Sequence, residues 1–111
     1  MRLKSVLYEK EQNKIMKQVI DILELDDENS ITLHELDTNP DKQKKLLDLI
    51  PIIRKYFSFS CIMGVREPEK IKRPYLSIIK HISKLKYKII TSDHRIKLKD
   101  KIIRTKKYYF I

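Results

Sequence analysis

Cationic side chains gather in the final stretch of the sequence, KRPYLSIIKHISKLKYKIITSDHRIKLKDKIIRTKKYYFI (72–111). Lys and Arg neutralise phosphates, while Ser and His can donate hydrogen bonds to phosphates or to base edges. The candidate binding residues of this type are Lys72, Arg73, Ser77, Lys80, His81, Lys84, Arg95, Lys97, Lys99, Lys101, Arg104 and Lys106. Their chemistry indicates binding to a polyanion without a chemical reaction.

Charge is divided unevenly along the 111 residues. Residues 1–50 hold 8 Lys/Arg against 11 Asp/Glu, a net of −3, whereas residues 51–111 hold 17 against 4, a net of +13. A nucleic acid would therefore meet the C-terminal half. The acidic half would discourage wrong docking or bind another protein.

Nothing in the sequence has the pattern of a catalytic or metal site. The chain has one glycine, which excludes a glycine-rich phosphate loop and the three-glycine dinucleotide fingerprint. His34, His81 and His94 have no second His or Cys at metal-ligand spacing. Cys61 is the only cysteine, so there is no disulfide framework and no cysteine zinc site, and a reducing, intracellular compartment is favoured.

Carboxylates are equally unpromising as metal ligands. The cluster Asp26–Glu28 lacks the sixth-position glycine and the ligand spacing of a calcium loop, so a solvated turn is expected. A nuclease needs clustered carboxylates for magnesium, and residues 51–111 offer only Glu67, Glu69, Asp93 and Asp100. We therefore expect no enzyme activity, no metal and no cofactor.

A helix is predicted over residues 74–86. Pro74 suits the first helical position, and Arg73 before it is biased away from helical backbone angles. Apolar residues recur at helical spacing and should be buried: Tyr75, Leu76, Ile78, Ile79, Ile82 and Leu85. The other face carries Ser77, Lys80, His81 and Lys84, which would face a groove or simply remain solvated.

A basic β-ribbon is predicted over residues 87–111. Residues 95–99 (RIKLK) alternate strictly, with cations outward and aliphatic residues inward, and 102–111 has strong strand composition. Turns are predicted at 92–93 and 99–101. We expect the apolar face to pack on the preceding helix and the cationic face to project into solvent. The alternative is an edge hairpin whose lysines only prevent aggregation.

The N-terminal part predicts further elements. Residues 1–8 fit either a helix or a short strand, and 9–25 form an amphipathic helix. Alternation predicts a strand over 31–36, and Pro40 begins a helix that runs to Phe57 with a kink at Pro51. Residues 58–73 form a connector with turns at Gly64 and Pro68, and Cys61 is expected to be a buried thiol.

The predicted order matches one α+β domain, residues 1–111, with the plan of a winged helix-turn-helix. It has three helices, the middle one kinked at Pro51, and a C-terminal β-hairpin wing. In that plan the third helix enters the major groove and the wing touches the neighbouring backbone. The long connector departs from the short turn of the ordinary motif. Duplex DNA is favoured over RNA as the partner, and no apolar run has membrane-spanning length.

Three runs also resemble a known family: IRKYF (53–57), KRPYLSIIKHISKLKYKII (72–90) and IRTKKYYFI (103–111). They are similar to a domain of large double-stranded DNA virus proteins, which is often the N-terminal part of a longer protein and is regarded as DNA-binding. The resemblance spans about residues 30–111. It implies a viral, nucleic-acid-linked role in the host cytoplasm or nucleus, with a companion domain either missing or never present.

Two other interpretations stay open. Small winged helices also serve as protein-docking units, and the acidic first helix, with Glu11, Asp21 and Glu24, would be the contact. A homodimer is a further option, because a single recognition helix covers few base pairs and binds weakly.

Overall fold

The computed structural model describes residues 2–57, 63–83 and 86–111, with side chains from residue 9 onward, and shows an α+β fold. Its elements are α1 (Arg2–Leu23), β1 (Ser30–Thr32), α2 (Leu33–Asp37), α3 (Pro40–Leu47), α4 (Ile50–Tyr56), α5 (Met63–Arg66), the 3-10 turn η1 (Pro68–Lys70), α6 (Pro74–Ser83), β2 (Ile89–Leu98) and β3 (Lys101–Phe110). The expectation of three helices is therefore wrong. The predictions for Cys61, Lys84 and Leu85 lie outside the described residues.

Helix α1 begins earlier than the clear periodicity, so residues 2–8 are helical. Its apolar stripe is buried as predicted, at Ile15, Met16, Val19 and Leu23. The helix ends at Leu23, whose carbonyl accepts a 2.8 Å hydrogen bond from Lys42 Nζ. The acidic residues that follow lie outside the helix, in agreement with the predicted loop.

The predicted strand over 31–36 is wrong over residues 33–36. β1 has three residues, and α2 begins directly at Leu33. The Thr32 hydroxyl accepts a 3.1 Å hydrogen bond from Glu35 N–H and caps this helix, which competes with strand continuation. A six-residue alternation of apolar and polar residues is too short to distinguish these two outcomes.

The helix from Pro40 breaks before Pro51, where a kink was expected. Asn39 caps α3 by accepting from Lys42 N–H at 3.1 Å, and the helix ends at Leu47. A second helix, α4, starts at Ile50 with Pro51 in its first turn. Proline has no N–H and cannot extend a preceding helix, but it is tolerated in a first turn, so two helices replace one.

The connector is more structured than predicted, because it contains α5 and η1. Gly64 is helical and buried, and no turn is formed there. A Cβ on Gly64 would overlap the Ser77 side chain and come within 2.9 Å of Ile71 Cδ1. The glycine therefore lets α5 approach α6 at Ser77.

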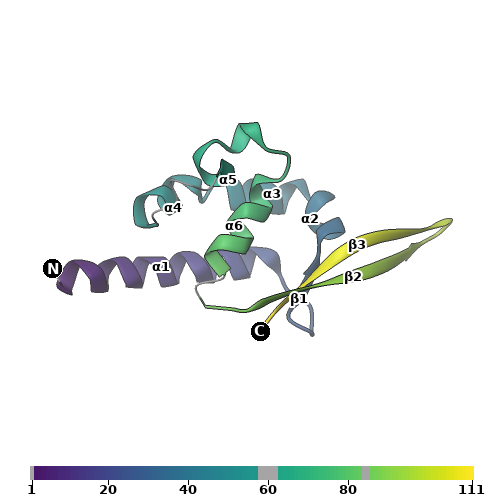
Figure 1. Ribbon diagram of the computed structural model, residues 1–111, viewed down its shortest axis with the longest axis horizontal. Coiled ribbons are helices and arrows are strands. Elements are labelled where there is room, and N and C mark those ends of the chain that lie inside the picture. Colours follow the sequence, from purple (N-terminus) through teal and green to yellow (C-terminus); the bar gives the residue numbers. More distant parts are fainter. Residues whose placement is uncertain (1, 58–62, 84–85) are drawn as a thin grey trace.

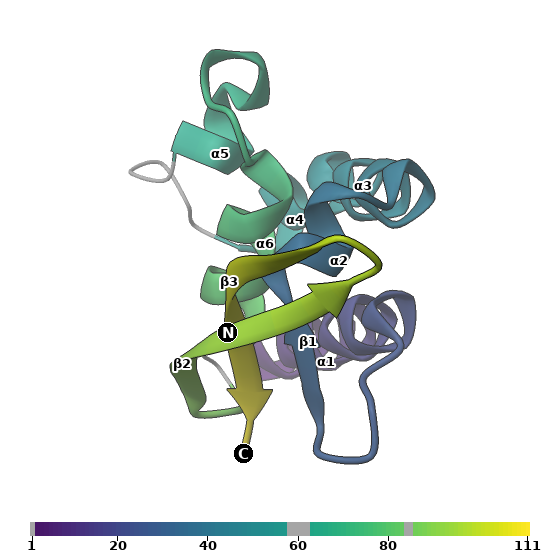
Figure 2. The same cartoon turned by 90° about the vertical axis from the view of Figure 1, so that its right-hand side faces the viewer.

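Three antiparallel strands form one sheet in the order β1-β3-β2. The β2–β3 ladder is unbroken from Ile89↔Phe110 to Leu98↔Lys101. The turn predicted at 92–93 is therefore wrong, whereas the turn at 99–100 is confirmed. β1 pairs with the base of β3, and the outer part of the ribbon projects beyond the helices (Figures 1 and 2).

The core lies between α1, α3, α4 and α6, with further buried residues from α2, α5 and the base of the sheet, and α4 lies at the end away from the ribbon (Figure 1). The predicted stripe of α6 is buried at Tyr75, Ile78, Ile79 and Ile82, and the sheet contributes Ile31, Tyr108 and Phe110. The molecule is elongated, with extents of 58 × 31 × 22 Å, because the ribbon extends from one end.

Candidate nucleic-acid interface

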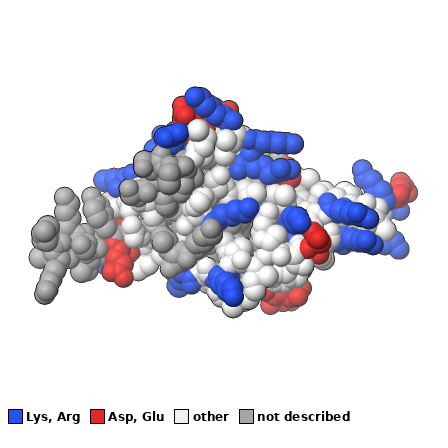
Figure 3. Space-filling view, viewed as in Figure 1, with Lys and Arg blue, Asp and Glu red and all other residues white. Residues whose placement is uncertain are grey.

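Four predicted cations lie on one face of the β2–β3 ribbon. Residues paired across an antiparallel ladder share a face, and alternate residues along a strand share a face. The pairs Arg95↔Arg104, Lys97↔Ile102 and Asp93↔Lys106 therefore lie on the same face as Ile89↔Phe110. We call Arg95, Lys97, Arg104 and Lys106 the cationic face. Figure 3 shows Lys and Arg side chains gathered over this ribbon.

The orientation of the ribbon differs from the expectation. Phe110 and Tyr108 on this face are buried against the helices, so the cations continue the face that packs on the core. The aliphatic residues Ile96 and Ile103 pair with each other on the opposite face, where neither is fully buried. The reason is the unbroken ladder: without a turn at 92–93, strand alternation carries one face from base to tip.

Arg95↔Arg104 is the one pair of the β2–β3 ladder in which two like charges lie directly opposite each other. Lys88 and Ile111 exchange both backbone hydrogen bonds, at 2.9 Å each. Counting along the ladder makes Arg95–Arg104 a non-hydrogen-bonded pair, the type with Cα atoms about 4.5 Å apart and side chains closer together. Within the described residues neither guanidinium makes an ion pair. Like charges placed this way destabilise a sheet unless an anion lies between them.

One neighbouring pair is already neutralised. Lys106 donates to Asp93 across the strands, and this hydrogen bond lowers the pKa of Asp93 and raises that of Lys106. Lys106 therefore remains cationic, but part of its charge is balanced on the ribbon itself. Arg95, Arg104 and Lys97 make no ion pair among the described residues, although Arg104 adds to the effect of Lys106 in lowering the pKa of Asp93.

A cleft of about 350 Å³ separates the ribbon from α2 and the start of α6. Arg104 and Lys106 line it from the ribbon, and Arg73 lines it from the helical side. The two sides are held together where Thr105 Oγ1 accepts a 2.9 Å hydrogen bond from His34 N–H. The structure thus brings together cations that are 31 or more residues apart in the sequence.

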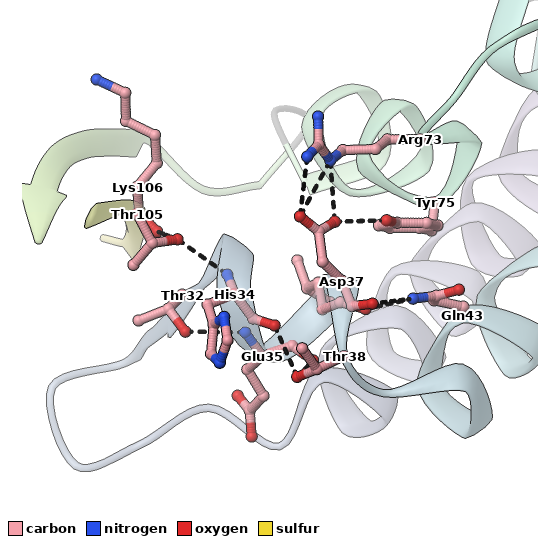
Figure 4. A network of polar contacts seen from close by, with 11 residues as sticks. Thr32, His34, Glu35, Asp37, Thr38, Gln43, Arg73, Tyr75, Thr105 and Lys106 are labelled. Atoms are coloured by element: carbon pink, nitrogen blue, oxygen red, sulfur yellow. Dashed lines mark hydrogen bonds and ion pairs between the residues drawn. The ribbon is translucent and has the colours of Figure 1, made fainter. Parts of the chain in front are cut away.

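Arg73 is not free within this cleft. Its guanidinium donates to both carboxylate oxygens of Asp37, at 2.9 to 3.2 Å, and Tyr75 Oη donates to the same carboxylate. Figure 4 shows Asp37 between the two donors, with Lys106 pointing away from them. Arg73 therefore orients the start of α6 against α2 and contributes less net charge than an unpaired arginine.

Burial and hydrogen bonding act in opposite directions on the pKa of Asp37 but in the same direction on the pKa of Tyr75. Burial raises the pKa of Asp37, but the hydrogen bonds from Arg73 and Tyr75 outweigh it, so the pKa lies below the ordinary value of 3.8. Burial, followed by the hydrogen bond to Asp37, raises the pKa of Tyr75 to about 12. At neutral pH the network holds a carboxylate, a guanidinium and a neutral phenol.

Helix α6 offers less surface than expected. Ser77 is half-buried where Gly64 packs on it, and His81 is also half-buried. Lys80 is exposed, with its ammonium 5.8 Å from the centre of the Tyr108 ring. The predicted groove-facing surface is therefore narrower at Ser77, because α5 in the connector packs on this side of the helix.

The other predicted residues lie at the edges of this arrangement. Lys72 is exposed just before α6, and Lys99 lies in the ribbon turn. Lys101 pairs with Leu98 and so faces away from the cationic face. The structure gathers four of the twelve candidates on one face and places Arg73 across the cleft from them.

Sequence reasoning missed the partners of these cations. Nothing local signals that Asp37 binds Arg73, since the two are separated by 36 residues. It also missed Lys107, which is buried and reaches Glu28 at 3.1 Å and Asp26 at 3.5 Å. Hydrogen bonding to Glu28 raises the pKa of Lys107, whose role is to hold the acidic loop against the sheet.

Helix α1 is not the acidic helix that was expected, because Arg2–Leu23 holds five Lys/Arg against three Asp/Glu. A groove of about 610 Å³ runs between α1 and the segment before β2, and it is lined by Lys10, Asn13, Lys14, Met16, Lys17, Ile20, Lys86 and Tyr87. Of the three acidic residues expected to make a protein contact, Glu11 is half-buried beside Lys14, while Asp21 and Glu24 are exposed outside this groove.

No protein-family model, curated protein or solved structure matches this chain. Over the described residues, no helix is long and apolar enough to cross a bilayer. The same residues contain no group of three His, Cys, Asp or Glu side chains placed to hold a metal ion.

Proposed function

We propose that this protein binds nucleic acid, with duplex DNA favoured, through the cationic face of the β2–β3 ribbon. The observation that carries the proposal is the unpaired Arg95–Arg104 juxtaposition on a projecting ribbon. A phosphate between two guanidiniums converts a repulsive pair into two charge-assisted contacts. Lys97 and Lys106 on the same face extend the contact along the backbone.

The strand order supports a winged-helix plan as part of this proposal. A helix, a short strand, further helices and a hairpin occur in that order, with β1 paired to the last strand. In this plan the ribbon is the wing. Because α5 covers Ser77, the wing contributes more to binding than α6, whose described contribution is Lys80. Binding is then driven mainly by phosphates and is weakly dependent on base sequence.

The viral resemblance favours the same partner. It remains a proposal drawn from three runs of sequence. Two of these runs include elements of this surface: residues 72–90 contain α6 and the start of β2, and residues 103–111 contain most of β3. Binding by electrostatic contact requires no cofactor and no chemical step.

The test measures anisotropy of labelled random duplex DNA across a salt series, with single-stranded DNA and duplex RNA alongside. Each phosphate contact contributes a slope of about −0.9 in log K against log salt on B-DNA. Arg95→Ala with Arg104→Ala should make this slope shallower by about 2 and weaken binding at low salt by about tenfold or more.

The matched control removes the same charge elsewhere. Lys44→Ala with Lys45→Ala takes two exposed lysines from α3, where each is paired with an aspartate in the next or preceding turn. This control should change the slope little. Equal losses in both double variants would mean that net charge alone attracts DNA, and an absence of DNA binding by the unaltered protein would refute the proposal.

Protein docking at α1 is the second candidate. The observation that favours it is the groove of about 610 Å³, in which four lysines surround an apolar floor. Its chemistry fits an acidic peptide with an apolar side chain, and the acidic residues proposed from sequence are not its lining. Lys14→Glu with Lys17→Glu should abolish binding of such a peptide and leave the Arg95–Arg104 contact unaffected.

A further inference from the structure

The outer edge of β2 is a ten-residue strand edge without a partner in the described sheet. The sheet order places β3 between the other two strands, so β2 is bonded on one side only (Figure 2). Because Lys88 bonds to Ile111 with both backbone groups, even-numbered residues of β2 point their backbone groups toward β3. The odd-numbered residues Thr91, Asp93, Arg95 and Lys97 therefore direct N–H and C=O outward.

We infer that this edge pairs with the same edge of a second copy, in antiparallel orientation, around His94. This inference does not rest on nucleic-acid binding. A two-fold axis at His94 places Asp93 opposite Arg95 of the second copy, and Arg95 opposite its Asp93. The outward backbone groups of Asp93 and Arg95 then form hydrogen-bonded pairs between the copies.

Charge complementarity selects this register. Charged residues on an edge strand ordinarily prevent pairing. Shifting the axis by one residue toward the base of the ribbon places Asp93 opposite its own copy, and shifting it toward the tip does the same to Arg95. Only the axis at His94, among these three, matches opposite charges at both symmetric positions.

Apolar residues fit the same register. Ile90 and Leu98 are among the large hydrophobic residues most exposed in the described chain, at 41% and 38%. Both lie on the face opposite the cationic face, four residues on either side of His94. Around that axis Ile90 of each copy lies opposite Leu98 of the other, so two exposed pairs become covered. One register thus accounts for the charges and for the exposure of Ile90 and Leu98.

The consequence is a continuous sheet of both ribbons. Directly paired residues share a face, so the cationic faces of the two copies lie on the same side of that sheet. The helical bodies lie at opposite ends, because the strands are antiparallel. The partner is therefore a second copy of this chain. Asp93 of each copy then lies between its own Lys106 and Arg95 of the other copy, and Lys97, Arg104 and Lys106 of both copies lie on one side of the sheet.

Sedimentation velocity of nuclease-treated protein over a concentration series tests the inference. Asp93→Arg places Arg opposite Arg95, and Arg95→Asp places Asp opposite Asp93, so each single variant should raise the dimer dissociation constant by about tenfold or more. The double variant Asp93→Arg, Arg95→Asp restores both pairs and should dimerise like the unaltered protein. An equimolar mixture of the two single variants should form heterodimers.

Thr91→Pro tests the backbone separately from the charges. Thr91 N–H points outward, so proline loses no bond to β3 but removes a donor from the second edge. It should also weaken the dimer, while circular dichroism shows an unchanged fold. A monomer at all concentrations, single variants that dimerise as tightly as the unaltered protein, or a mixture that fails to pair would each overturn the inference.

Discussion

Lys42 shows how a single charged side chain can belong to the core. It is 5% exposed, and its ammonium donates to the Leu23 carbonyl at 2.8 Å and to Glu35 Oε1 at 3.3 Å. The first bond satisfies a carbonyl at the C-terminus of α1, where a positive charge also interacts favourably with the helix dipole. The side chain therefore joins α1 to α3 in a position that composition alone assigns to solvent.

Replacing Lys42 by Met should lower the free energy of unfolding by about 1–3 kcal/mol, because the Leu23 carbonyl loses its partner. Urea denaturation followed by circular dichroism measures the change. Lys44→Met is the control, since Lys44 is exposed and makes a single ion pair with Asp48; it should change stability by less than about 0.5 kcal/mol. Equal effects would show that Lys42 Nζ is not a cap.

Asp37 makes stability depend on pH in the acid range. Its folded pKa is lowered, so its contribution is fully present above the unfolded value near 3.8 and is lost as the pH falls through the folded pKa. Asp37→Asn should cost about 1–3 kcal/mol at pH 7, since it weakens the bonds to Arg73 and Tyr75. Its stability should also fall less steeply below pH 4.

The measurement is urea denaturation at several pH values from 7 down to 2, with Asp41→Asn as the control. Asp41 is exposed, and among the described residues its ion pair is with Lys45, so its replacement should leave the acid profile nearly unchanged. Tyr75 offers a second readout: its phenolate absorbance should appear near pH 12, and in Asp37→Asn it should appear at lower pH. A Tyr75 titration near 10 in the unaltered protein would contradict the network.

At the scale of elements, the contact between α5 and α6 decides what the predicted recognition helix can present. Gly64 lies in a helix and directly over Ser77. In a solvent-exposed helix, Gly→Ala stabilises by about 1 kcal/mol. Here the added Cβ would overlap Ser77, so the two effects have opposite signs.

Gly64→Ala should therefore destabilise the protein, by about 1–3 kcal/mol, because α5 must shift away from α6. Thermal or urea unfolding checks this. In a Ser77→Gly background the overlapping atoms are absent. Gly64→Ala should therefore cost less stability in that background than it costs in the unaltered protein. Stabilisation by Gly64→Ala in the unaltered background would mean that α5 does not cover Ser77 in solution.

For the whole molecule, the ribbon has a base that belongs to the core and an outer part that we propose contacts DNA. Tyr108 and Phe110 at the base are 3% exposed and belong to the core. None of residues 95–104, all of them described, is buried. The two parts of one hairpin should therefore respond differently to truncation.

Replacing residues 95–104 by Asn-Gly joins His94 to Thr105, a hydrogen-bonded pair of the same type as the one that flanks the present two-residue turn. The melting temperature should change by only a few degrees, whereas DNA binding should be lost. Phe110→Ala is the contrasting variant and should cost about 3–5 kcal/mol. Undiminished DNA binding by the shortened ribbon would move the interface to another surface.

The fold was predictable where the pattern was long and local. The stripes of α1 and α6 follow from 3.6-residue spacing, and the start of α3 follows from Asn39 and Pro40. Predictions failed at residues 33–36 of the strand predicted over 31–36 and at Pro51, because short patterns leave local caps and breaks to decide the outcome. The predicted turn at 92–93 failed because cross-strand pairing outweighed polar turn residues.

The sequence by itself determined the α+β composition, the buried helical stripes and the concentration of positive charge in 51–111, since these depend on side-chain type and short-range spacing. Only the tertiary structure decided which cations share a face, that Asp37 holds Arg73, and that α5 covers Ser77. These relations depend on strand register and on contacts between residues far apart in the chain. A one-residue change of register would reverse every face of the ribbon while leaving the sequence pattern unchanged.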